Sequence, residues 1–348
     1  MRKKREMQKF CGSLQQMVRS RLVTYQDGFA AGMRCIQVKS GELEYELMVD
    51  KCLDPSTISY QGINIGFLTK PGLQGGGFFD ANKAEAPRSI MCGAMMTCGF
   101  ENIHGHLSLE GKEYPTHGRM RSTPAEQFGT DCYWKEDSCT IQSHGEMRES
   151  EIFGENIVLR RMVETSYPIP AIHFRDQIEN QGFREEPFCF LYHCNIGYPF
   201  LEPGCRMYLP DKKCMPRDFA AEEGISKWNL MEDPIDNAPE QVFLHELYGD
   251  SQGNTLGCVV NERLHLGYCV RFNLHQMPYL VEWKTIASGD YAWAMEPCNT
   301  GFGGRKEAED FLEPGEIREH HLTIEILEGE EAIEKCRKEI GALAPTII

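Results

Sequence analysis

The sequence predicts an all-β fold, a large antiparallel β-sandwich with minor helices, and three observations favour it. Apolar and polar residues alternate with a period of two in many short runs, which is typical of strands that bury one face. The 33 glycines and 18 prolines supply turns between these runs. Helical periodicity is scarce, and the strand–helix alternation of a parallel sheet is missing. Short strands joined by turns therefore indicate antiparallel sheets that pack face to face.

The individual elements can be placed along the chain. Residues 188–194 are apolar on both sides, as expected for a strand between two layers. Residues 219–228 have a weak helical period. Residues 264–272 and 322–326 alternate cleanly, and apolar residues recur at helical spacing from 333 to 343. We therefore expect a buried central strand, two strands with one buried face, a short helix and a C-terminal helix.

The domain organisation predicted from the sequence is simple. No fixed-period repeat and no low-complexity linker divides the 348 residues. We expect an N-terminal segment over residues 1–30, followed by a single β-sandwich domain over residues 31–348 that carries the functional site.

Charge and hydropathy exclude several classes of partner. The formal net charge of −16 repels phosphate backbones, so we expect no nucleic-acid partner. No segment approaches the roughly 20 apolar residues that span a bilayer, and the basic start at residues 2–5 is not followed by the apolar run of a signal peptide. We expect no membrane association. The sequence does not fix the oligomeric state and is compatible with a homodimer.

The cysteine content predicts a reducing environment. Fifteen cysteines without a secretion signal are typical of free thiols rather than a disulfide framework, and no Cys-x-x-Cys pair occurs. We therefore expect a cytoplasmic protein.

Two residues are candidates for general acid–base chemistry on a sugar. Interconverting the anomers of an aldose requires a base that takes the C1 hydroxyl proton and an acid that protonates the ring oxygen, and a carboxylate and an imidazole suit these tasks. Glu296 is our candidate base, and because Pro297 follows it, we expect it at a strand end. His193, within the apolar strand, is our candidate acid. By spacing alone, each also fits a structural role, as a surface glutamate or a hydrogen-bonded core histidine.

Other histidines carry weaker signals. His117 and Arg119 flank Gly118, and the bare backbone there would let both side chains reach into a cleft from a loop. The pairs at 104/106 and 320/321 are rich in histidine but lack the spacing that specifies a zinc or iron site. We therefore expect no metal and no cofactor.

Several motifs together resemble the aldose 1-epimerase (galactose mutarotase-like) superfamily, in particular a poorly characterised bacterial branch. The similarity runs from about Leu43 to Leu327. The motifs that carry it are Met-Met-Thr-Cys-Gly-Phe-Glu-Asn at 95–102, His-Gly-Arg at 117–119, Thr-Pro-Ala-Glu at 123–126, Tyr-His-Cys-Asn-Ile-Gly-Tyr-Pro at 192–199, Glu-Pro-Cys-Asn at 296–299 and Leu-Glu-Pro-Gly-Glu at 312–316.

This resemblance implies a β-sandwich that binds a small-molecule carbohydrate in an open cleft on a concave sheet. It implies that His193 protonates the ring oxygen, that Glu296 is the base, and that His117 holds sugar hydroxyls. His245 stands near the place of an aspartate that contacts the sugar in well-studied mutarotases, which makes galactose or glucose doubtful as the substrate. The candidates for substrate binding are therefore His117, Arg119, Asn195, His245, Asn299 and Arg305, the last near any phosphate or carboxylate on the sugar.

Three functions follow as hypotheses. The first is an aldose 1-epimerase-like isomerase without a cofactor. The second is an isomerase or eliminase acting on a modified sugar in the same cleft, because abstraction of a carbon-bound proton uses the same kinds of residue. The third is a non-catalytic carbohydrate-binding or sensing protein, against which the retention of both His193 and Glu296 argues.

Overall fold

A computed structural model describes residues 3–75, 86–90 and 93–344 of the chain, and an eight-stranded antiparallel sheet is its largest element. In spatial order this sheet contains β15 (Arg206–Tyr208), β18 (Asn254–Asn261), β19 (Leu266–Asn273), β23 (Ile317–Glu328), β12 (Ala171–Asn180), β11 (Asn156–Tyr167), β10 (Ser138–Ser150) and β9 (Glu126–Lys135).

Two smaller antiparallel sheets form the facing layer. One is a meander of consecutive strands, β1 (Val18–Thr24), β2 (Arg34–Ser40), β3 (Leu43–Met48), β4 (Asp54–Tyr60) and β5 (Ile63–Asn64). The other has the order β16 (Asp211–Pro216), β17 (Gln241–Leu247), β20 (Tyr279–Thr285), β21 (Ala292–Cys298), β14 (Cys189–Ile196) and β6 (Met95–Phe100). Two short antiparallel pairs complete the strands: the hairpin of β7 (Leu107–Leu109) with β8 (Lys112–Tyr114), and the pair of β13 (Glu186–Pro187) with the distant β22 (Phe311–Leu312).

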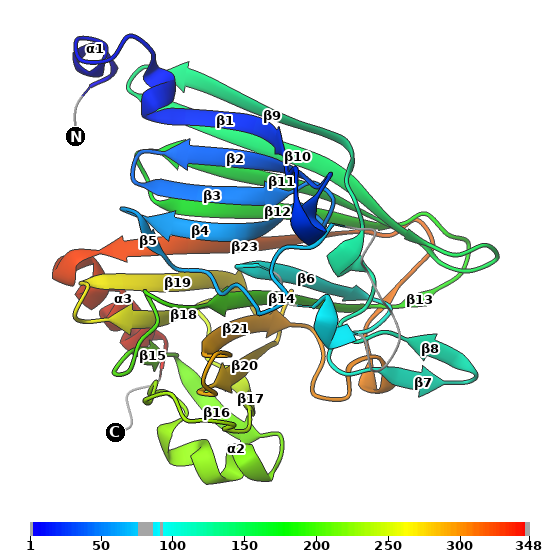
Figure 1. Cartoon of the computed structure of the whole chain (residues 1–348). Coiled ribbons are helices and arrows are strands. Elements are labelled where there is room, and N and C mark those ends of the chain that lie inside the picture. The colour runs from blue at the N-terminus through cyan, green and yellow to red at the C-terminus, as the bar shows by residue number, and fades with distance from the viewer. Residues whose placement is uncertain (1–2, 76–85, 91–92, 345–348) are drawn as a thin grey trace.

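The three large sheets enclose one hydrophobic core. Figure 1 shows β1–β5 in front of β9–β12, and the six-stranded sheet lower in the view beside β18 and β19. An isolated bridge between Gly66, which follows β5, and Ile196 of β14 links the two smaller sheets. Buried apolar residues from all three sheets form one continuous cluster. The predicted all-β sandwich is therefore confirmed.

Helices are few and short apart from the last. They are α1 (Lys4–Met7), α2 (Phe219–Gly224) and α3 (Gly329–Leu343), with single 3-10 turns at Leu14–Gln16, Gly28–Ala30, Ala86–Arg88, Met120–Ser122, Ile225–Lys227 and Gly304–Glu307. Helix α3 buries Ile333, Cys336 and Ile340 against β18, β19 and β23. None of the helices in the described residues is long and apolar enough to cross a membrane.

The periodicities read from the sequence match these elements. The predicted strands correspond to β14, β19 and β23, and the predicted helices to α2 and α3. In β19 the four residues of the apolar series from Leu266 to Phe272 enter the main core, while Cys269 on the other side packs under α3. Within the proposed N-terminal segment, β1 pairs with β2 along its whole length.

A buried ionic network links the three sheets. Arg161 of β11 contacts Asp54 of β4 and Asp176 of β12, each at 2.6 Å. Asp54 accepts hydrogen bonds from the backbone N–H and the hydroxyl of Thr97 in β6, and Asp176 accepts one from the Tyr192 hydroxyl of β14. Because both carboxylates are shared with the six-stranded sheet, this network fixes β6 and β14 against the large sheet.

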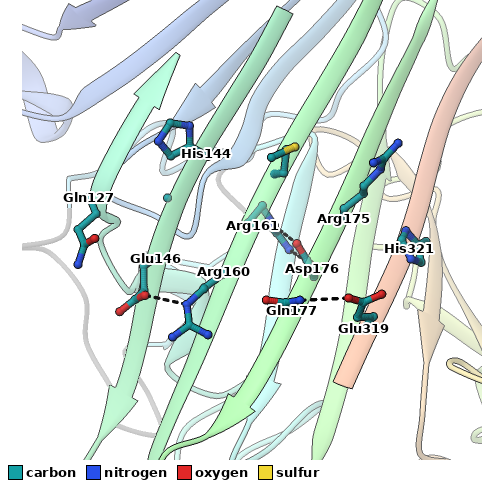
Figure 2. A pocket seen from close by; sticks show the side chains of 12 residues that line it. Gln127, His144, Glu146, Arg160, Arg161, Arg175, Asp176, Gln177, Glu319 and His321 are labelled. Carbon is teal, nitrogen blue, oxygen red and sulfur yellow. Dashed lines mark hydrogen bonds and ion pairs between the residues drawn. The ribbon is translucent and has the colours of Figure 1, made fainter. Parts of the chain in front are cut away.

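The outer face of the large sheet carries an open depression of about 610 Å³. Figure 2 shows the side chains of β9–β12 and β23 around it, among them the exposed His144, Arg175 and Glu319. The fully buried side chains of Arg161 and Asp176 point to the opposite, inner face of the sheet. None of the candidate site residues lies there.

Candidate active site

Strand β14 presents two different faces. Phe190, Tyr192 and Cys194 belong to the main core between the sheets. Leu191 belongs to a second apolar cluster on the opposite face of the six-stranded sheet, together with Met96 and residues of β17, β20 and β21. Since side chains alternate along a strand, His193 and Asn195 share the face of Leu191. The candidate acid therefore lies on the side of this sheet that points away from the sandwich core.

Glu296 reaches the same face from the neighbouring strand β21. Its Oε1 lies 3.1 Å from Nε2 of His193, and both side chains are almost completely buried. The expectation that Glu296 ends its strand is wrong, because β21 continues through Pro297 to Cys298. The pairing of β21 with β14 is instead interrupted, since Met295 and Cys298 have partners in β14 and the two residues between them have none. Proline, which has no N–H to donate, fits such a gap.

A tightly packed loop brings His117 to this pair. The His117 ring meets the His193 ring edge-on with centroids 5.4 Å apart. Both His117 and Gly118 have positive φ angles of 60° and 70°. A Cβ on Gly118 would lie 2.3 Å from the carbonyl oxygen of Gly99, so glycine is required there.

Two further aromatic residues belong to the cluster and were missed by sequence reasoning. The ring centroids of His104 and His117 lie 6.4 Å apart, and the carbonyl oxygen of His104 accepts the His117 backbone N–H at 2.8 Å. The Trp283 ring lies 5.8 Å from the His193 ring, and its N–H donates to the exposed Glu240 at 2.8 Å. Trp283 is partly exposed. Its signal in the sequence was weak, because a tryptophan inside an apolar strand usually belongs to the core.

The cluster contains an unusual number of buried polar atoms without a hydrogen-bond partner. Among the described residues, no hydrogen bond of acceptable geometry is found for Nδ1 of His117, Nδ1 of His193, Oδ1 of Asn195, Oε1 of Glu296 and Nε2 of His104. Two of these atoms nevertheless have a polar neighbour, since Oε1 of Glu296 lies 3.1 Å from Nε2 of His193 and the Asn195 side chain interacts with the His193 ring. Buried polar atoms are nearly always satisfied in native proteins, and exceptions call for a functional explanation. This group of atoms therefore retains unused hydrogen-bonding capacity.

Burial also governs the protonation of these groups. Loss of hydration lowers the pKa of His193 to about 3 and that of His104 to about 4, and it holds the pKa of His117 well below its usual value. The same loss raises the pKa of Glu296 well above its usual value. In the ligand-free protein, burial thus favours the neutral form of both the His193 imidazole and the Glu296 carboxyl group.

The two candidate asparagines have different surroundings. Asn195 donates from Nδ2 to the carbonyl oxygen of Gly93 at 3.0 Å, and its carbonyl oxygen faces the group of unsatisfied atoms as an acceptor. Asn299 accepts the backbone N–H of Phe190 at 2.7 Å and donates to Phe188 and Asp310 at 2.9 Å. Its contacts hold the beginning of β14 in place, so the structure gives Asn299 a supporting position.

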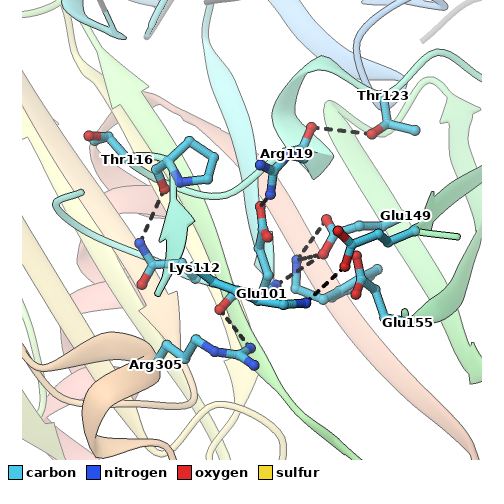
Figure 3. Close-up of polar contacts among 12 residues, drawn as sticks. Glu101, Lys112, Thr116, Arg119, Thr123, Glu149, Glu155 and Arg305 are labelled. Carbon is cyan, nitrogen blue, oxygen red and sulfur yellow. Dashed lines mark hydrogen bonds and ion pairs between the residues drawn. The ribbon is translucent and has the colours of Figure 1, made fainter. Parts of the chain in front are cut away.

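Arg119 and Arg305 come together at a neighbouring site. Figure 3 shows both side chains near Glu101, where Arg119 forms an ion pair with the carboxylate and Arg305 donates to the backbone oxygen at 3.0 Å. They line a polar pocket of about 480 Å³ together with Glu149. Glu149 accepts the backbone N–H groups of Phe100 and Glu101, and burial with the nearby Glu101 carboxylate raises the pKa of Glu149 to about 8. His193 and Glu296 do not line this pocket.

His245 lies on the other face of the six-stranded sheet. Val242 and Leu244 of β17 share the second apolar cluster with Leu191, so His245 points the opposite way. Its ring contacts Asp211 at 3.1 Å and Glu282 at 3.0 Å, and Glu282 also accepts the N–H of Trp293 in the main core. The structure therefore separates His245 from the His193–Glu296 pair.

In the part of the chain that the structure describes, no three His, Cys, Asp or Glu side chains are arranged to hold a metal ion. His106 contacts Glu113, and His320 packs edge-on against Phe188 and Phe190. Of the two histidine-rich segments, the structure thus brings one residue, His104, to the candidate site.

The fold has clear relatives among solved structures. The protein is similar to a candidate aldose 1-epimerase from Klebsiella pneumoniae, with a TM-score of 0.87 and 20% identity over 94% of this chain and 88% of that one. It is also similar to a galactose mutarotase-like protein from Clostridium acetobutylicum, with a TM-score of 0.60 and 15% identity over 89% of this chain and 99% of that one. The galactose 1-epimerase from Lactobacillus acidophilus gives a TM-score of 0.57 and 10% identity over 90% of this chain and 100% of that one. These similarities define a galactose mutarotase-like β-sandwich.

The family follows from the sequence itself. Residues 30–326 match the family described as a domain of unknown function, DUF4432, and the protein belongs to that family. The comparison with curated proteins found no match.

Proposed function

We propose that the protein is an aldose 1-epimerase-like isomerase, which interconverts the anomers of a monosaccharide or sugar derivative by acid–base catalysis without a cofactor. The observation that carries this proposal is the group of unsatisfied buried atoms around the 3.1 Å contact between His193 and Glu296. A polyhydroxylated ligand offers both donors and acceptors to such a group.

The close approach of the two side chains suits this reaction. The C1 hydroxyl and the ring oxygen are bonded to the same carbon, so a base and an acid that lie side by side can serve both. Hydrogen bonds from sugar hydroxyls to the Glu296 carboxylate would favour its charged form, and a proton lost from the Glu296 carboxyl group would pass to His193. Glu296 then takes the C1 hydroxyl proton while His193 protonates the ring oxygen. The ring opens, the C1–C2 bond rotates, and closure reverses the two proton transfers.

The other residues of the cluster would position the sugar. His117 and the carbonyl oxygen of Asn195 offer hydrogen bonds to hydroxyls, and the indole of Trp283 offers an apolar surface to the C–H face of the ring. At the edge of the indole, Glu240 is held by Arg217 at 2.9 Å and presents a further acceptor. In this proposal Arg119 and Arg305 contribute through the loop that carries His117, since both hold Glu101 beside it.

Saturation-transfer NMR of anomer exchange tests the proposal directly. Over a panel of neutral, phosphorylated and oxidised sugars, we expect exchange with at least one sugar and a loss of roughly 10²- to 10⁴-fold for Glu296→Gln. Glu246→Gln is the matched control. This glutamate is partly exposed, and its carboxylate forms long ion pairs with Lys212 at 3.8 Å and Lys213 at 3.9 Å. Equal exchange rates in the wild type and Glu296→Gln would refute the role of Glu296 as the base.

The same sugars separate the alternatives. Incorporation of solvent deuterium at a carbon atom would indicate isomerisation or elimination, because ring opening and closure exchange only oxygen-bound protons. A ligand-induced rise in melting temperature without turnover of any sugar would indicate a binding or sensing protein.

A further inference from the structure

Two cysteines on the β9–β10 hairpin lie unusually close to each other. The sulfur atoms of Cys132 and Cys139 are 3.3 Å apart. Cys132 pairs in register with Ile141, and Cys139 pairs with Trp134, so the two thiols occupy diagonal positions on one side of the hairpin. No movement of a distant segment is needed to bring them together, because the turn between the strands already holds them in contact.

The two thiols differ in accessibility. Of the fourteen cysteines in the described residues, Cys132 is the one that is exposed, while Cys139 is fully buried in the main core. The hydrogen bond from the Cys139 thiol lowers the pKa of Cys132 to about 7, and partial burial opposes that shift. Since the thiolate is the reactive form of cysteine, Cys132 combines exposure with reactivity, and Cys139 has the position of a resolving thiol.

We propose that Cys132 and Cys139 form a reversible intramolecular disulfide when the protein meets a hydroperoxide. The Cys132 thiolate attacks the peroxide, so that an S–O bond forms, the O–O bond breaks, and an alcohol or water leaves after protonation. The Cys139 thiol then attacks the sulfenic sulfur, so that the S–S bond forms, the S–O bond breaks, and water leaves with the thiol proton. In total two thiols lose two electrons, and one peroxide is reduced to an alcohol and water, or to two waters.

The disulfide would have a local structural effect. β9 is one of the two edge strands of the large sheet. Beside the thiols, the backbone N–H of Lys4 donates to Asp137 in the hairpin turn at 2.9 Å, and the Lys4 ammonium lies 5.3 Å from the centre of the Trp134 ring. A cross-link between β9 and β10 would thus rigidify the surface on which the N-terminal helix rests.

Thiol counting and peptide mapping on the full-length protein test this proposal. After reduction and removal of the reductant, one equivalent of hydrogen peroxide is added, and free thiols are counted in denaturant. We expect the loss of two thiols per chain, a peptide pair linked through Cys132 and Cys139 by mass spectrometry, and full recovery with dithiothreitol. In Cys139→Ala, dimedone should label Cys132 as the trapped sulfenic acid.

The control variants are Cys11→Ser and Cys214→Ser, which remove the partly exposed thiols. Both should retain the peroxide-dependent loss of two thiols, whereas Cys132→Ser should abolish it. Mapping of wild-type protein decides the matter even if the Cys139 variant does not fold. A disulfide between other cysteines, or a Cys132 that stays reduced while other thiols are oxidised, would overturn the proposal.

Discussion

Replacing Arg161 by methionine tests whether one buried cation holds the three sheets together behind the candidate site. Arg161 is 1% exposed and contacts the carboxylates of Asp54 and Asp176, each also almost fully buried, at 2.6 Å. Removing one partner of a buried ion pair typically costs about 3–5 kcal/mol, because the remaining charge is left uncompensated. Here two carboxylates lose their partner, so we expect Arg161→Met to lower the free energy of unfolding at pH 8 by at least about 3 kcal/mol.

The variant should also have a distinctive pH dependence. Burial, opposed by the charge of Arg161, raises the pKa of Asp54 to about 6. The folded protein therefore binds more protons than the unfolded chain between about pH 4 and pH 6, and this group makes stability fall as pH rises through that window. Without Arg161 the folded-state pKa rises further, and the loss extends to higher pH. At pH 5 Asp54 is already mostly protonated, so Arg161→Met should cost less there than at pH 8.

Urea unfolding followed by circular dichroism at pH 5 and pH 8 measures both effects. The triple variant Arg161→Met, Asp54→Asn, Asp176→Asn should recover much of the lost stability, because neutral amides need no counter-charge. Arg263→Met is the surface control, since Arg263 is exposed and solvent screens its ion pair with Glu202, so this variant should leave the stability nearly unchanged. A loss below about 1 kcal/mol for Arg161→Met at pH 8, or equal losses at the two pH values, would contradict this account of the network.

Three further predictions concern other buried groups and the loop of His117. His245→Leu should lower the free energy of unfolding by about 3–5 kcal/mol in urea titrations, because Glu282 loses its cation. Burial lowers the pKa of His245, but contacts with Asp211, Cys214 and Glu282 outweigh burial and raise this pKa well above its usual value. The stabilisation by His245 is therefore complete below about pH 6.5 and is lost as pH rises through the folded-state pKa. Gly118→Ala should cost about 2–4 kcal/mol by thermal unfolding and reduce anomer exchange, whereas Gly111→Ala, also at positive φ but with open space around it, should cost only about 1–2 kcal/mol and leave exchange intact. Glu149→Gln should be nearly neutral at pH 7 and should flatten the fall in wild-type stability between about pH 4 and pH 8, since the raised pKa of Glu149 keeps its carboxyl group protonated in the folded state; an unchanged pH profile would contradict it.

Much of the fold could be predicted from local pattern. The alternation from Leu266 to Phe272 reflects one face in the main core and another under α3, and the apolar run of β14 reflects burial on both sides. These patterns report the surroundings of a single strand. The order of the strands does not appear in them, because β6, β14 and β21 are neighbours in space and lie far apart in the chain.

The candidate site divides in the same way. The structure brings His193, Glu296 and His117 together, with His193 and Glu296 in direct contact, and Asn195 lies on the same face. The acid–base roles of these residues stay a prediction. His245 was misplaced because a shift of one residue along a strand moves a side chain to the opposite face. The sequence could not place Arg119 and Arg305, which both contact Glu101. It could not place Asn299 either, whose partners are Phe190 and Asp310. These contacts depend on how loops pack against β6 and β14.

Strand β14 connects the stability of the protein to its proposed chemistry. Tyr192 points inward and donates to Asp176 of the Arg161 network, and the next residue, His193, points outward to Glu296. On the neighbouring strand, Thr97 binds Asp54 of the same network, and Met96 lies opposite His193. Because these contacts fix β6 and β14 from behind, the buried charges determine where the imidazole stands. Pro297 adds the complementary feature on the other side, since the interrupted pairing between β14 and β21 falls at Glu296. The sheet thus keeps an imidazole and a carboxyl group in contact by placing a rigid strand beside a local gap in the hydrogen-bond ladder, and several polar atoms there make no hydrogen bond within the protein.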